Sequence, residues 1–306
     1  QRMPMGPWRE ANHNIAVLPS SIKPSMIATL AFPAPRIIYD FYLMGGSVQG
    51  VTYPPLLPRP DFVMLETSQG ERIPAVHVKE PNAKFTIIYS HGNGEDIGIL
   101  LKFFDDLARN VGANVLAYDY VGYSLSRLEG MAPSEDGCYR SVDAAWRYLT
   151  INRHVQPEHI VLFGRSIGSG PTCDMASWGP GLSCGGVILQ SPLSSCARVL
   201  FGDAGLLARP LDPFPNYAKV DRICAPVAIM HGVRDSVVPI DHGKTLFSLC
   251  KNPFEPLWLD NSGHDNIPFD QTFTYVQEFL ESLETSPRIQ YEDQYSSWTS
   301  CVLCSS

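Results

Sequence analysis

Short apolar runs alternate with longer helical stretches from Phe62 to Leu283. Continuous apolar runs of this length are typical of strands buried on both faces of a sheet. The predicted strands are Phe62–Glu66, Pro74–Val78, Phe85–Tyr89, Asn114–Tyr118, His159–Phe163, Gly186–Leu189, Val227–Met230 and Leu257–Leu259. The predicted helices are Ile97–Arg109, Ser134–Ile151, Ile167–Trp178, Asp241–Cys250 and Phe269–Leu283. The pattern predicts an α/β fold: an eight-stranded, mostly parallel sheet with helices on both faces and a hairpin at its start.

A serine flanked by two glycines follows the fifth predicted strand, in the order Gly164-Arg165-Ser166-Ile167-Gly168. Gly-x-Ser-x-Gly between a strand and a helix is the pattern of a nucleophile elbow, a sharp turn that holds a serine hydroxyl at its tip. Glycines supply clearance where such a turn passes close to neighbouring backbone. The spacing predicts that Ser166 is a nucleophile.

An acid and a histidine follow two later strands, in the order expected for such an elbow. Asp235 follows the strand Val227–Met230, and His264 follows Leu257–Leu259. A serine hydroxyl needs a base to accept its proton, and a carboxylate fixes the tautomer of that base. Singly, Asp235 is also typical of a solvated turn and His264 of a surface loop. Together they predict a Ser166–His264–Asp235 triad, because the carboxyl ends of parallel strands meet at one edge of a sheet.

The loop after Phe85–Tyr89 contains the run His91-Gly92-Asn93-Gly94. A loop at this place can direct a backbone N–H group at the oxyanion that forms when a serine attacks a carbonyl. We predict an oxyanion hole made by the N–H groups of Asn93 and Ile167, with Gly94 as the alternative to Asn93. His91 is predicted to hold this loop rather than to act as the base.

Charge and cysteine usage exclude several classes of function. The net charge is −8, whereas a nucleic-acid binder needs a basic surface to neutralise phosphates. No apolar stretch reaches the roughly 20 residues needed to span a bilayer. The eight cysteines lack the spacing of a disulfide framework, which favours reduced thiols in the cytoplasm. Cys301 and Cys304 have the spacing of half a zinc site without a second half, so we expect neither a metal nor another cofactor.

The chain divides into three parts by composition. Residues 1–60 are rich in proline but also apolar, which predicts a segment that packs on the domain or on a membrane surface. Residues 61–285 hold the predicted sheet and triad. Residues 286–306 lack periodicity and are predicted to be a disordered tail.

Several strings spread over residues 24–283 carry a resemblance to a known family. They are Pro24 to Pro33, Tyr89-Ser90-His91-Gly92-Asn93, Tyr118 to Tyr123, Gly164 to Gly168, Ser191-Pro192-Leu193, Phe214-Pro215-Asn216, Glu255 to Trp258 and Gly263-His264. They resemble the α/β-hydrolase-domain-containing protein 17 family. The family pattern has glutamine at the position of Arg165 and glycine at that of Ser124. Its cysteine-rich N-terminal cluster has no counterpart here, so a mode of membrane delivery is not implied.

The resemblance implies an α/β-hydrolase fold and a serine hydrolase that removes palmitate from cysteines of membrane-anchored proteins. Ser166 would be the nucleophile, Asp235 the acid and His264 the base. The implied partners are S-palmitoylated proteins, reached by peripheral contact at the cytosolic face of a membrane.

A long acyl chain requires an apolar groove, and residues 191–215 lie where α/β hydrolases insert lid material. The residues predicted to line it are Leu193, Val199, Leu200, Phe201, Leu206, Leu207 and Phe214. The same residues are equally typical of a layer that covers a helix. We also expect Asp119 to fix a loop, paired with Arg165.

Two other classes of function fit the same motifs. A carboxylesterase, lipase or peptidase uses the same triad, and substrate competition would separate these enzymes from a thioesterase. A catalytically silent interaction module is the alternative outside enzymes, but such modules usually lack a member of the triad.

Overall fold

The computed structural model describes residues 47–48, 51–52, 59–128, 130–178, 184–202 and 212–285. Strands β1 (Ser47–Val48) and β2 (Val51–Thr52) pair with each other. Apart from residues 59–60, the rest of the predicted N-terminal segment lies outside the described residues, as do the predicted tail and the groove residues Leu206 and Leu207.

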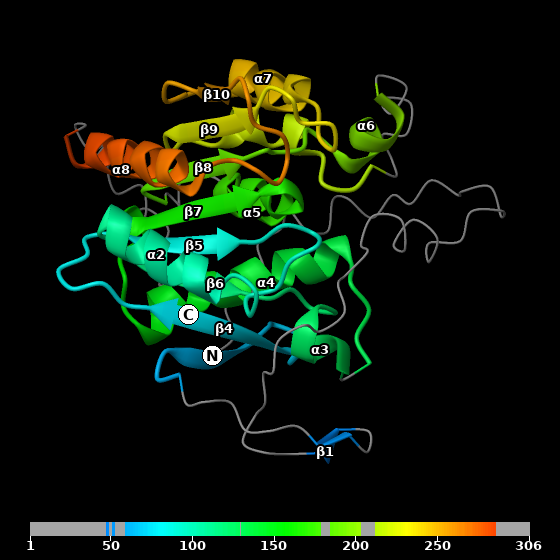
Figure 1. Ribbon diagram of the computed structural model, residues 1–306. Helices are drawn as coiled ribbons and strands as arrows, with labels where there is room; N and C mark the ends of the chain where they lie inside the picture. Colours follow the sequence, from blue (N-terminus) through cyan, green and yellow to red (C-terminus); the bar gives the residue numbers. More distant parts are fainter. Residues whose placement is uncertain are drawn as a thin grey trace, which may run out of the picture.

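Eight strands form one sheet in the order β10-β9-β8-β7-β5-β6-β4-β3 (Figure 1). Their bounds are β3 Phe62–Glu66, β4 Arg72–Val78, β5 Thr86–Ser90, β6 Asn114–Tyr118, β7 Ile160–Arg165, β8 Gly186–Gln190, β9 Val227–Gly232 and β10 Leu257–Leu259. Strand β4 pairs antiparallel with β3 and with β6, whereas the other neighbours are parallel. The predicted sheet, with its hairpin at one edge, is confirmed.

Helices cover both faces of the sheet. Their bounds are α2 Leu101–Val111, α3 Ser124–Leu128, α4 Glu135–Arg147, α5 Ser169–Ala176, α6 Cys196–Phe201, α7 Ile240–Leu249 and α8 Phe269–Thr285. The hydroxyl of Ser134 accepts the N–H of Gly137 at 3.0 Å, which caps α4 where the sequence predicts its start. The predicted last turn of α4 is instead a π-helical turn, Tyr148–Asn152. Within the described ranges, no helix is long and apolar enough to span a membrane.

Helix α2 begins four residues later than predicted. The carboxylate of Asp119 accepts the N–H of Ile97 at 2.9 Å, and that of Asp96 accepts the N–H of Ile99 at 3.0 Å. These two contacts hold the chain before Leu101 as a loop, since side-chain acceptors compete with helical hydrogen bonding.

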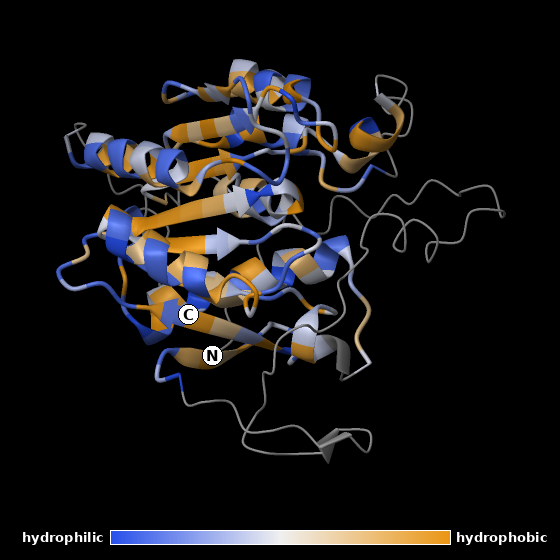
Figure 2. Cartoon of the chain, in the orientation of Figure 1, coloured by the Kyte–Doolittle hydropathy of each residue, from blue (hydrophilic) through white to orange (hydrophobic). Residues whose placement is uncertain are grey.

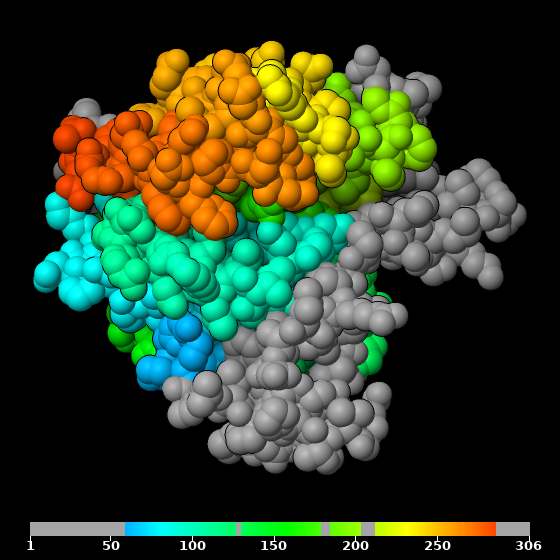
Figure 3. Space-filling view, in the orientation of Figure 1, coloured from blue at the N-terminus to red at the C-terminus, as the bar shows by residue number. Residues whose placement is uncertain are grey.

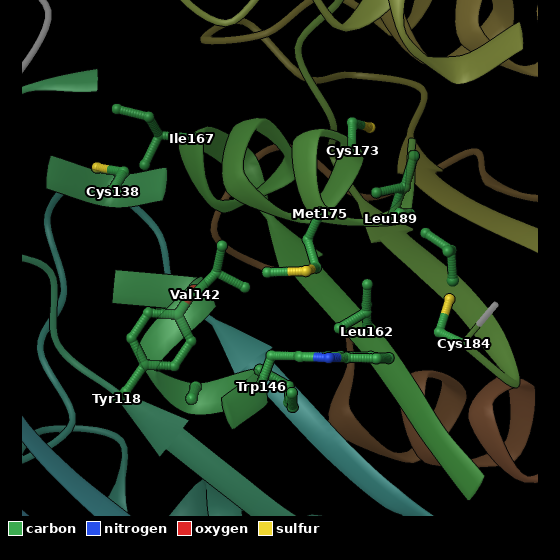
Figure 4. Packing of buried hydrophobic residues seen from close by; sticks show 14 of the residues in the cluster. Tyr118, Cys138, Val142, Trp146, Leu162, Ile167, Cys173, Met175, Cys184 and Leu189 are labelled. Carbon is green, nitrogen blue, oxygen red and sulfur yellow. The ribbon is translucent and has the colours of Figure 1, made fainter. Parts of the chain in front are cut away.

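Alternate residues of each central strand pack on opposite faces, as the pleat requires. In β7, Ile160 and Leu162 pack with α4 and α5, whereas Val161 and Phe163 pack with α2 and α8. Figure 2 shows the apolar strands lying inside the more polar helices. In Figure 3, α2 and α8 form a continuous surface over one face of the sheet. Figure 4 shows the other core, in which Trp146 of α4 lies near Leu162 of β7.

The centre of the sheet contains a topological switch. Strands β5 and β7 are neighbours, but the chain goes from β5 to β6 on one side and from β7 to β8 on the other. Ligands of open α/β sheets bind outside the carboxyl ends of the strands at such a point. The loops after β5 and β7 therefore border the place where a site is expected.

Candidate active site

Ser166 sits at the turn between β7 and α5, in a backbone conformation that non-glycine residues rarely adopt. Its φ is +53°, which costs about 1–3 kcal/mol and persists only where the surroundings enforce it. The hydroxyl of Ser169 donates to the Ser166 carbonyl at 2.6 Å and helps to fix the turn. The predicted nucleophile elbow is therefore present, and it presents the serine at the carboxyl end of a central strand.

The two glycines of the elbow lie against backbone. A Cβ added at Gly168 would lie 2.1 Å from the Ser90 carbonyl oxygen, at the end of β5. A Cβ at Gly164 would lie 2.6 Å from the Gly168 carbonyl oxygen. Both distances are far inside van der Waals contact, so the motif needs glycine at both positions for close approach.

Gly168→Ala is expected to lower the free energy of unfolding by at least about 3 kcal/mol, because a methyl group cannot fit against the Ser90 carbonyl without moving β5 or α5. The matched control is Gly94→Ala, since a Cβ at Gly94 meets no atom within 4 Å and should change stability by less than about 0.5 kcal/mol. Urea unfolding followed by circular dichroism measures both. Equal midpoints for the two variants would contradict the packing described for the elbow.

The three predicted triad side chains form one hydrogen-bonded line. His264 Nε2 lies 2.9 Å from Ser166 Oγ, and His264 Nδ1 lies 2.7 Å from Asp235 Oδ2. A carboxylate can only accept, so Nδ1 carries the imidazole proton and Nε2 is free to accept the serine proton. The Asp235 side chain is fully buried, whereas that of His264 is 10% exposed. This is the hydrogen-bonding geometry that activation of a serine nucleophile requires.

Asp235 is held as an ionised carboxylate. Its other oxygen, Oδ1, accepts the N–H groups of Val237 at 2.9 Å and Val238 at 2.8 Å. Burial alone would raise its pKa, but hydrogen bonds with His231, His264 and the Val238 N–H outweigh burial and hold the pKa well below its usual range. The acid therefore stays charged throughout the neutral range and can stabilise a protonated His264.

The predicted oxyanion donors lie on the two loops beside the serine. Ile167 follows Ser166 at the start of a helical turn, where backbone N–H groups have no acceptor within the helix. Asn93 lies in the loop after β5, and its side-chain oxygen accepts the hydroxyl of Tyr123 at 2.5 Å. The N–H of Gly92, one residue earlier, donates to Glu95 at 2.7 Å. The roles of Asn93 and Ile167 as oxyanion donors remain predictions.

Arg165 does not pair with Asp119, contrary to expectation. Asp119 instead accepts the Ile97 N–H and lies 3.4 Å from Nε2 of the buried His91. The guanidinium of Arg165 contacts Glu95 on the loop after β5. It also contacts Asp265 at 2.9 Å on the histidine loop, which is the loop after β10 that contains His264. The Arg165 side chain is only 13% exposed and therefore needs a carboxylate partner. The sequence alone does not indicate which of several acids on different loops lies close to it.

The predicted acyl-groove residues separate into two groups. Phe214 is fully buried. Its ring packs against Tyr139 and occupies the space that a side chain at position 170 would need, so it does not line a groove as predicted. Leu193 is also buried, and Val199 packs on the core. Leu200 and Phe201 of α6 are 53% and 64% exposed, so their predicted contact with an acyl chain remains open.

The buried cysteines offer no competing nucleophile. All six described cysteines are free, and four of them are buried: Cys138, Cys173, Cys184 and Cys196. Burial raises the pKa of the Cys184 and Cys196 thiols to about 12, so neither forms the reactive thiolate near neutral pH. Across the ranges that the structure describes, no cluster of three or more histidine, cysteine or acidic side chains could bind a metal ion.

Comparisons with known proteins agree with the fold described above. A family model described as serine aminopeptidase, S33, matches residues 81–211. The α/β-hydrolase-domain-containing protein 17B of Xenopus tropicalis is 40% identical over 219 residues, covering 71% of this chain and 74% of the relative. The human protein of the same name is 38% identical over the same shares.

Solved structures share the fold at low sequence identity. Est1E from Butyrivibrio proteoclasticus matches with a TM-score of 0.59 and 16% identity, over 74% of this chain and all of that one. The esterase domain of a Rhodothermus marinus protein matches with a TM-score of 0.53 and 18% identity, over 73% of this chain and 97% of that one. These likenesses show an α/β-hydrolase architecture.

Proposed function

The chain belongs to the α/β-hydrolase-domain-containing protein 17 family, and we propose that this serine hydrolase cleaves palmitoyl thioesters from S-acylated proteins. The observation that carries the proposal is the Ser166–His264–Asp235 line at the carboxyl edge of the sheet. It supplies a nucleophile, a base and a charged partner for the base, as acyl transfer requires.

The first half of the reaction acylates Ser166. His264 Nε2 takes the proton of Ser166 Oγ while Oγ attacks the thioester carbonyl, and the carbonyl oxygen becomes the oxyanion. The C–S bond then breaks, and protonated His264 gives its proton to the departing cysteine sulfur. Asp235, being ionised and buried, stabilises the imidazolium between these two transfers.

The second half releases the fatty acid. Water enters, His264 takes one of its protons, and the resulting oxygen attacks the acyl-serine carbonyl. Collapse of the second tetrahedral intermediate breaks the bond to Ser166 Oγ, which regains its proton from His264. The products are a free cysteine on the protein and a free fatty acid.

Exposed apolar side chains at this edge support an acylated, membrane-bound substrate. Val233 and Val237 flank Asp235 on its loop and are 39% and 52% exposed, and the exposed Leu200 and Phe201 follow β8 at the same end of the sheet. Such side chains can contact an acyl chain or the lipid interface. We propose that the substrates are S-palmitoylated proteins, approached by peripheral contact at the cytosolic face of a membrane.

The substrate class can be tested by direct competition. Purified protein receives a palmitoyl-cysteine peptide and a palmitoyl-serine peptide of the same sequence, and mass spectrometry follows the loss of each. The proposal expects faster loss of the thioester, in both single-substrate and mixed assays. Preferential cleavage of the oxyester would assign the protein as an esterase instead.

Activity is expected to fall as the medium becomes more acidic, because a protonated imidazole can no longer act as a base. Asp235 adds no second decline near neutrality, because its pKa is lowered. The check is kcat/KM measured from pH 5 to 8 with the thioester peptide. A flat profile would contradict a histidine base.

Loss of the fold at low pH must be separated from this effect. Burial lowers the pKa of His77 to about 3 and, with the charges of His231 and Arg198, lowers that of His242 to about 4. Unfolding lets both rings take up protons near their ordinary pKa, so the free energy of unfolding decreases as the pH falls from about 6.5 toward about 4. Circular dichroism at each assay pH therefore defines the range in which kinetics report on the folded protein.

A further inference from the structure

Arg165 lies directly before the nucleophile and joins three segments of the chain. Its Nη1 contacts Glu95 Oε1 on the loop after β5, 70 residues away in sequence. Its Nη2 donates to Asp265 Oδ1 at 2.9 Å and to the His264 carbonyl at 3.4 Å. One arginine of the elbow thus contacts both the predicted oxyanion loop and the histidine loop.

The ion pair with Glu95 lies against the backbone of the predicted oxyanion loop. Glu95 Oε2 accepts the N–H of Gly92 at 2.7 Å, while Glu95 Oε1 faces Arg165. A Cβ at Gly92 would lie 2.8 Å from Glu95 Oε2 and 3.3 Å from Arg165 Nη1. The position of the loop that precedes Asn93 is therefore coupled to the position of the arginine.

The contacts with the histidine loop act at His264 itself. The chain before His264 is fixed separately, because the Arg234 N–H donates to the Ser262 carbonyl at 2.9 Å. Arg165 binds the carbonyl of His264 and the side chain of the next residue. The planar guanidinium can bind the carboxylates of Glu95 and Asp265 at once, which a lysine ammonium does less well.

We propose that Arg165 is a positioning residue that holds His264 and the loop of Asn93 in the correct position relative to Ser166. This inference rests on the proposed serine-hydrolase function but not on the choice of thioester as substrate. A displacement of about 1 Å at a reacting group can cost about 100-fold in rate. Loss of the bridge should therefore appear in kcat more than in KM.

The test uses Arg165→Met in the full chain, with p-nitrophenyl butyrate as the probe. We expect kcat to fall about 100-fold, with KM changed less than about twofold. Arg165→Lys should recover part of the loss, because an ammonium can pair with one carboxylate. The matched control is Arg140→Met, since Arg140 also contacts two acids, Glu71 and Asp136, but joins α4 to the β3–β4 turn away from the triad. The control should lose stability and keep its kcat.

A double variant separates positioning from an unpaired buried charge. Arg165→Met leaves Glu95 without its cationic partner, and an unpaired charge on a largely buried side chain is itself destabilising. The double variant, Arg165→Met with Glu95→Gln, lacks that charge. It also provides the kinetic test if the single variant Arg165→Met does not fold. We expect the double variant to keep the loss in kcat.

Three results would overturn the inference: wild-type kcat in the double variant, equal kcat in Arg165→Met and Arg140→Met, or a loss confined to KM. Absence of wild-type activity on the probe and on the thioester peptide would instead reject the proposed function.

Discussion

Ser166→Ala is expected to lower kcat by about 10⁶-fold, because the variant removes the hydroxyl that we propose forms the acyl-enzyme. Alanine, like serine, carries a Cβ at this positive φ, so we expect the elbow to remain folded. The measurement is hydrolysis of the palmitoyl-cysteine peptide by equal amounts of wild-type and variant protein, with circular dichroism as the check of folding.

Ser248→Ala is the matched control for this experiment. Ser248 is exposed on α7, where its hydroxyl donates to the carbonyl of Thr245 at 2.8 Å. Its kcat should equal that of wild type. Comparable activity of Ser166→Ala and Ser248→Ala would mean that another group attacks the substrate.

Asp235→Asn is expected to lower kcat by about 10⁴-fold while leaving the fold intact. The amide oxygen can still accept the N–H groups of Val237 and Val238, so its NH₂ group must face His264 Nδ1. Nδ1 then has to accept, which places the imidazole proton on Nε2. Nε2–H points toward Ser166 Oγ and cannot take the serine proton.

The comparison for Asp235→Asn is Asp260→Asn, an exposed position in the loop that leads to His264. Steady-state kinetics and urea unfolding are measured for both variants. A kcat for Asp235→Asn within tenfold of that for Asp260→Asn would show that the buried carboxylate does not control the tautomer. A large loss of stability in Asp235→Asn would show that its kinetic effect is structural.

The sheet and the convergence of the triad could be predicted from sequence because both follow from local patterns. Runs such as Asn114–Tyr118 are apolar on both faces, and a strand with that pattern must be covered by helices on both sides. Parallel strands bring their carboxyl ends to one edge, so residues just after β7, β9 and β10 meet there. Ser166, Asp235 and His264 are far apart in sequence but close in space for this reason.

Side-chain pairing and burial could not be predicted in the same way. Arg165 had several acids within possible reach, and the choice of Glu95 and Asp265 over Asp119 depends on how separate loops pack. Phe214 is apolar, as a groove residue would be, but its ring packs directly against the backbone of Gly170 on α5, where no side chain is present. Helix α6 could not be predicted from the sequence because it spans only Cys196–Phe201. Its N-cap residue, Ser195, directly follows another serine, so the sequence does not mark where the helix begins.

The most direct measurement of the central claim is the site of covalent labelling by a fluorophosphonate, which reacts with a serine only when a neighbouring base activates it. Wild-type protein is labelled and digested, and the modified peptide is sequenced by mass spectrometry. We predict a single adduct, on Ser166, that is lost below the pH at which histidine becomes protonated. An adduct on another residue, or turnover of the thioester by protein that the probe does not label, would contradict the assignment of Ser166 as the nucleophile.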